Sequence, residues 1–103
     1  MKESIINKLE RLVGRHEEIG NLLSDADIMS NQNEFRDLSR EYSELDPIVE
    51  LFARYQDVSG DLVSANEMLA DGDPEIRAMG QEEALALKQS IETLEGELRK
   101  QLI

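Results

Sequence analysis

Few side chains in this sequence could take part in catalysis, and His16 is the first to consider because it is the only histidine. An imidazole beside a serine hydroxyl could act as a general base. His16, however, occupies one position of a repeating apolar pattern, where a polar residue usually sets the register of packed helices. We therefore interpret His16 as a packed residue and predict no catalytic site.

The other patterns that could bind a metal or a cofactor are incomplete. The chain has no cysteine, which excludes disulfides and thiolate metal sites. Asp25 and Asp27 are spaced like the start of a calcium loop, but the glycine and the distal glutamate of such a loop are missing. There is no glycine-rich phosphate loop. We predict that the protein is not an enzyme and uses no cofactor or metal.

The charge pattern limits the partners that the protein could bind. The formal net charge is −12, and residues 24–103 carry seven basic side chains against 19 acidic ones. This acidity predicts no strong direct binding to nucleic acid. It indicates either a solvated surface that aids solubility or a face for a basic partner. The exception is Lys8, Arg11 and Arg15, whose spacing places them on one helical face, and these three are the candidate partner contact.

Apolar residues repeat at alternating steps of three and four, which predicts helices that pack along a seam. We expect a first helix at about 3–23, and residues 24–33 are rich in turn formers. Asn31 followed by Glu34 indicates the start of a second helix. The seam positions of the first two helices are Ile5, Leu9, Leu12, His16, Ile19 and Leu23, then Phe35, Leu38, Tyr42, Leu45, Val49, Phe52, Tyr55, Val58, Leu62, Ala65 and Leu69.

Pro47 falls inside the second apolar repeat, which continues across it almost in phase. A proline in a helix interior lacks a donor and clashes with the preceding turn. We favour one long helix at about 32–71 that is kinked or locally loosened near residues 43–47. The alternative is two abutting helices, with Asp46 and Pro47 opening the second.

The segment Asp71–Glu75 is the strongest break in the pattern. Gly72 suits the end of a helix, Asp73 an N-cap and Pro74 the first position of a third helix at about 74–101. The third seam contains Ile76, Met79, Ala84, Leu87, Ile91, Leu94 and Leu98. The predicted fold is all-α: a single domain, 1–103, built as an elongated, antiparallel, coiled-coil-like bundle of three helices. No apolar run is long enough to span a membrane, so we expect a cytoplasmic protein.

Four stretches in series resemble the start of bacterial peptide chain release factor 1, a class I translation release factor. They read MKESIINKLERLVGRHEEI, LLSDADI, FRDLSREYSELDPIVE and DPEIRAMGQEEA. The resemblance covers nearly the whole chain. It is closer to the factor for UAA and UAG than to the sibling for UAA and UGA.

Release factors of this kind read stop codons on the ribosome and trigger hydrolysis of peptidyl-tRNA, through a codon-reading tripeptide and a GGQ motif. This sequence has no Gly-Gly pair. The resemblance therefore implies an excised N-terminal helical domain that serves as a docking and spacer module. The partners that it implies are the stalk base of the large ribosomal subunit, the methyltransferase that modifies the GGQ glutamine, and the GTPase that recycles the factor.

A second hypothesis needs no release factor. Helices of unequal length leave seam residues such as Ile48, Leu51 and Leu62 without partners inside the chain, which would favour association. The chain would then be an autonomous coiled-coil adaptor or a homodimerising module.

Overall fold

The computed structural model describes residues 1–103, and all of its regular elements are helices. These are α1 (Glu3–Leu22), α2 (Ala26–Met29), α3 (Gln32–Met68) and α4 (Pro74–Gln101). The prediction of an all-α fold with three long helices is confirmed, whereas the short α2 was not predicted. No helix has both the length and the apolar character that crossing a membrane requires. The chain forms two compact units, Met1–Glu50 and Leu51–Ile103.

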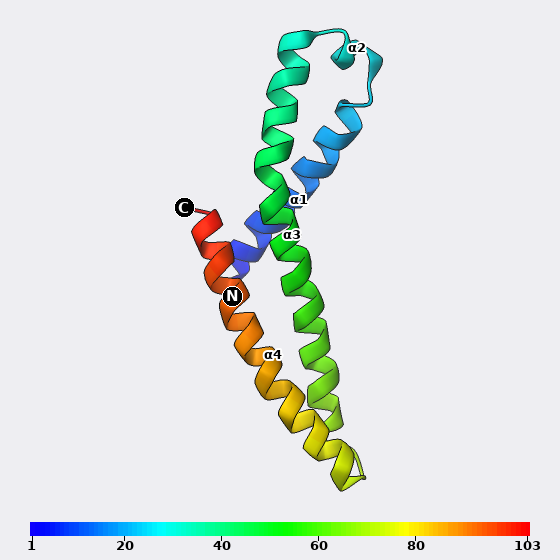
Figure 1. Cartoon of the computed structure of the whole chain (residues 1–103), viewed down its shortest axis with the longest axis vertical. Helices are drawn as coiled ribbons and strands as arrows, with labels where there is room; N and C mark the ends of the chain where they lie inside the picture. Colours follow the sequence, from blue (N-terminus) through cyan, green and yellow to red (C-terminus); the bar gives the residue numbers. More distant parts are fainter. The chain divides into compact units, whose positions relative to one another are not determined.

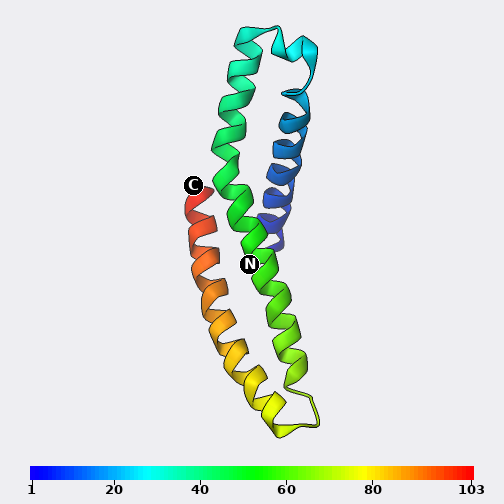
Figure 2. The same ribbon diagram turned by 45° about the vertical axis from the view of Figure 1, so that its right-hand side comes forward.

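In the first unit, α1 and the first part of α3 run antiparallel, as both views show (Figures 1 and 2). Leu9 and Ile19 on α1 are fully buried, and Leu45 on α3 is nearly so. All three are predicted seam positions. The heptad pattern therefore identified the buried side of this hairpin.

Side-chain caps define the connection between α1 and α3. The Asp25 carboxylate accepts a hydrogen bond from the Asp27 N–H at 2.8 Å, which caps α2. The Asn31 side chain accepts one from the Glu34 N–H at 3.2 Å, so the predicted start of the second helix is confirmed. Asp25 thus serves as an N-cap, and its spacing from Asp27 reflects that role.

Pro47 lies inside α3, which continues as one helix from Gln32 to Met68. The prediction of one long helix is confirmed, and the alternative of two abutting helices is wrong. Pro47 itself is exposed. Because it has no N–H, the carbonyl of Ser43 loses its usual partner one turn earlier.

The second unit is a hairpin of the last part of α3 and α4, again antiparallel in both views (Figures 1 and 2). Its buried side chains are Phe52, Ala65, Ala84, Leu94 and Leu98. Gly80 is also buried, and sequence reasoning missed it. A Cβ atom built on Gly80 would lie 2.7 Å from the Met68 Cβ and 2.9 Å from the Ala65 carbonyl oxygen, so α3 and α4 approach closely here.

The α3–α4 connection follows the predicted capping but differs at the end of α3. The Asp73 carboxylate accepts a hydrogen bond from the Glu75 N–H at 2.9 Å, and Pro74 begins α4. The end of α3 was predicted at 71 but lies at Met68. Backbone hydrogen bonds between residues three apart tighten the chain from Asn66 to Asp71. Because α3 ends four residues before Gly72, the prediction that Gly72 directly follows the helix end is wrong, and no glycine has positive φ.

Three predicted seam residues are exposed instead of buried. The exposed fractions are 38% for Phe35, 42% for Leu69 and 54% for Met79. Phe35 and Met79 lie near the starts of α3 and α4, and Leu69 follows the end of α3. A side chain near a helix end has neighbours on one side only, so the apolar pattern overestimates the burial of Phe35 and Leu69. At Met79 the pattern is out of register by one residue, because the adjacent Gly80 is the residue that contacts α3.

Candidate functional site

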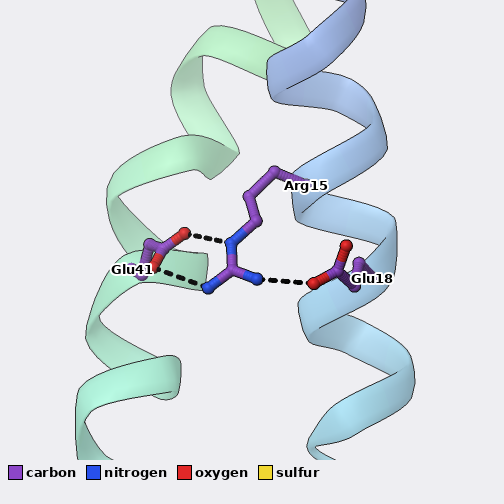
Figure 3. A network of polar contacts seen from close by, with 3 residues as sticks. All are labelled: Arg15, Glu18 and Glu41. Carbon is purple, nitrogen blue, oxygen red and sulfur yellow. Dashed lines mark hydrogen bonds and ion pairs between the residues drawn. The ribbon is translucent and has the colours of Figure 1, made fainter.

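The most connected polar group in the structure is Arg15 with Glu18 and Glu41 (Figure 3). The Arg15 Nε donates to the Glu41 Oε2 at 2.6 Å and Nη2 donates to Oε1 at 3.1 Å, which is a bidentate pair across α1 and α3. The third nitrogen, Nη1, donates to the Glu18 Oε1 at 2.6 Å. A guanidinium matches this arrangement because its donors form a planar fork.

The two carboxylates and the guanidinium stabilise one another's charges. The hydrogen bonds from Arg15 lower the pKa of Glu41 below its usual value. The same bonds raise the pKa of Arg15, chiefly through Glu41. Both side chains are more than a third exposed, so solvent screens the pair. The network therefore fixes the pairing of α1 and α3 more than it adds stability.

The next residue of α1, His16, also contacts α3. Its Nε2 lies 2.5 Å from the Asp46 Oδ1, and its ring stacks on Tyr42 with 4.1 Å between the centroids. The interpretation of His16 as a packed polar residue agrees with this environment. Asp46, which the two-helix alternative made an N-cap, instead binds His16. No hydroxyl or thiol forms a hydrogen bond with His16, so the pair lacks the nucleophile of a catalytic triad.

The three predicted contact residues lie on α1 but differ in surroundings. Lys8 and Arg11 are exposed, and neither forms a hydrogen bond or an ion pair. Arg15 is bound to two carboxylates, so part of its capacity to bind a partner is already used. The sequence did not indicate Glu41, because Arg15 and Glu41 are 26 residues apart and no local spacing relates them.

The first unit can thus present charge and hydrogen bonds, but it holds no arrangement for covalent chemistry. In a comparison with protein families, the model of the PCRF domain of peptide chain release factors matches residues 12–103. The match covers well over half of the chain. This chain belongs to the PCRF family.

PCRF domains are parts of peptide chain release factors, so the chain has the role of a release-factor N-terminal domain in translation termination. Release factors act on the ribosome and are not enzymes themselves. The family prediction is confirmed at this level. The match does not distinguish release factor 1 from its sibling. The PCRF range includes Arg15, Glu41 and Asp46 and begins after Lys8 and Arg11.

Proposed function

We propose that the chain is the N-terminal domain of a larger, cytoplasmic release factor that directs peptide release at UAA and UAG codons. In this proposal, residues 1–103 form a single domain that docks and spaces the factor on the ribosome. The PCRF match over residues 12–103 is the observation that carries the proposal. The choice of UAA and UAG rests on the sequence resemblance in the four stretches described above.

A docking role suits the chemistry of the residues. The sequence has no Gly-Gly pair, hence no GGQ motif. Its net charge of −12 favours contact with basic protein surfaces over contact with phosphates. We propose the stalk base of the large ribosomal subunit as the main contact. The GGQ-modifying glutamine methyltransferase and the recycling GTPase are further partners.

The test is a peptide-release assay on ribosomes programmed with UAA, UAG or UGA. The chain alone should release no peptide above the level without factor. Added in excess to an intact factor that contains this domain, it should slow release at UAA and UAG by competing for the docking surface. The intact factor itself should act on UAA and UAG but not on UGA.

Each arm of this assay addresses one part of the proposal. Release by the chain alone would contradict the docking role. Release at UGA by the intact factor would contradict the codon assignment. Undiminished release in the presence of excess chain would contradict independent docking of the domain.

The adaptor or homodimer hypothesis has one observation in its favour. Val63 and Leu85, both in the second unit, are 59% and 63% exposed. The net charge of −12 opposes self-association at low salt. Sedimentation at low and at high salt checks this: a dimer that depends on Leu85 would support the alternative.

A further inference from the structure

Two adjoining hollows lie between α3 and α4 in the second unit. The first has a volume of about 480 Å³ and the second of about 400 Å³, and both are open to solvent. Ala86 lines both, so the two hollows adjoin, and we call them together the α3–α4 groove. In a bundle, a third helix packs against two others along such a groove.

The length of the groove suits a helix. Its lining residues on α4 extend from Glu83 to Glu97, and those on α3 extend from Arg54 to Ser64. At 1.5 Å per residue, the α4 side is about 21 Å long, or about four helical turns. An extended peptide could also cover this length, but it would leave its backbone groups without partners against helical walls.

The lining combines a small apolar floor with acidic edges. Val58, Ala86 and Leu87 provide aliphatic surface, and the small side chain of Ala86 allows a close approach. Asp61, Glu83 and Glu97 line the same groove, and none of these carboxylates is held by a hydrogen bond or an ion pair within the chain. Arg54 is the only basic residue in the lining, so the groove has a net negative charge.

We propose that the α3–α4 groove binds an amphipathic, basic helix of a partner protein, with aliphatic residues toward Ala86 and lysine or arginine toward the three carboxylates. The proposal rests on the docking role proposed above and gives that role a surface. A second copy of this chain does not fit, because it would bring another net charge of −12 to an acidic groove. RNA does not fit either, since its phosphates would face the carboxylates.

The test uses the full chain and a labelled 18-residue helical peptide with leucine and alanine on one face and lysine along its edges. Fluorescence anisotropy at about physiological salt measures the affinity. Asp61→Lys/Glu83→Lys should weaken binding about tenfold or more, because the reversed charges repel the lysines. Glu10→Lys/Glu17→Lys makes the same change in net charge on exposed positions of α1 and should change the affinity less than about twofold.

A second pair of variants tests the apolar floor without changing charge. Ala86→Gln should weaken peptide binding about tenfold by filling the floor, whereas Ala78→Gln, at an exposed position of α4 outside the groove, should not. Equal weakening by the two charge variants would show non-specific attraction and overturn the proposal. Unchanged binding by Ala86→Gln would overturn it as well.

The two proposals fail in distinguishable ways. If the chain binds the peptide in the groove but does not compete with the intact factor on ribosomes, the docking role is wrong and the groove site stands. If the chain competes and the groove variants compete equally well, the groove assignment is wrong and the docking role stands.

Discussion

At the scale of single residues, Arg15 shows where sequence reasoning stops. The apolar pattern correctly placed Arg15 on a first helix, but neither that pattern nor its spacing from Lys8 and Arg11 says which residues lie on the opposite helix. Glu41 lies across the hairpin and binds the guanidinium at two atoms. Side-chain pairs between helices depend on their register. The heptad pattern predicts which faces meet, but not which polar residues meet beside them.

Gly80 carries the clearest prediction about packing. Gly80→Ala should lower the free energy of unfolding by about 1–2 kcal/mol. Overpacking costs about 1–3 kcal/mol, and the better helix propensity of alanine returns up to about 1 kcal/mol. The clash is with the Met68 Cβ and the Ala65 carbonyl, neither of which can rotate away. Chemical denaturation followed by circular dichroism gives the value.

Gly96 provides the matched control, because it lies on the same helix and a methyl group added there would have nothing within 4 Å. Gly96→Ala should raise the free energy of unfolding by up to about 1 kcal/mol. If both substitutions stabilised the protein equally, the close approach of α3 and α4 at Gly80 would be wrong.

Glu41 should make the stability of the protein depend on pH in the acid range. Arg15 lowers the pKa of Glu41 in the folded protein, so the folded state holds its proton less tightly than the unfolded state does. The resulting stabilisation is present above the ordinary glutamate pKa of about 4.5 and is lost as the pH falls through the lowered value. Glu41→Gln should therefore flatten the acid part of the stability curve.

Thermal unfolding between about pH 7 and pH 3 measures this effect. Glu44→Gln, at an exposed position of α3, controls for the loss of one negative charge. If the unfolding temperature of Glu41→Gln fell with decreasing pH as steeply as those of Glu44→Gln and the original chain, the pairing of Arg15 with Glu41 would be refuted.

At the scale of elements, the apolar period predicted most of the structure. Helices arise wherever residues three and four apart bury one stripe, and the seam continued in phase across Pro47 because α3 is one helix. The short α2 was missed since four residues cannot show a period. The end of α3 was placed too late because Gly72 was interpreted as a cap, whereas tightened turns end the helix first.

Pro47 also gives a prediction for α3 as an element. Pro47→Ala should raise the free energy of unfolding by about 1–2 kcal/mol. Alanine restores a backbone hydrogen bond and removes a clash, together worth about 3 kcal/mol, while the unfolded chain gains about 1 kcal/mol of entropy. Pro47 is exposed, so little packing is lost.

Glu50→Ala, at an exposed helical position one turn later, is the control for a change in side chain alone. Chemical denaturation of both variants makes the comparison. A loss of stability in Pro47→Ala beyond that of Glu50→Ala would mean that the proline supports α3 rather than straining it.

At the scale of the whole molecule, the composition argued against several classes of function but did not identify the actual one. The absence of cysteine and the single histidine left little room for catalysis, and the acidity argued against binding to nucleic acid. Neither pointed to translation. The link to translation came from the four short stretches that resemble a release factor, and the PCRF match agrees with it. The α3–α4 groove could not be foreseen, because its lining mixes predicted seam residues such as Val58 and Leu87 with polar residues that look like ordinary surface in the sequence.

The last prediction concerns ribosomal RNA. Non-specific binding to RNA depends on lysine and arginine neutralising phosphates, and residues 24–103 have seven such residues against 19 carboxylates. We expect negligible binding of the chain to stalk-base RNA alone at about physiological salt, and weak binding once the ribosomal protein of the stalk base is present. Titration of labelled RNA, with and without that protein, measures both.

Substitutions of Lys8 and Arg11 distinguish contact with ribosomal protein from contact with RNA. They are exposed and unpaired, whereas Arg15 holds α1 to α3, so a variant that reverses Arg15 would disturb the fold as well as the surface. Lys8→Glu/Arg11→Glu is therefore the cleaner probe. If the domain docks on ribosomal protein through its acidic surface, the affinity of this variant for the RNA–protein complex should stay within about threefold of that of the original chain. Tight, salt-sensitive binding to bare RNA that this variant abolishes would instead make α1 an RNA contact.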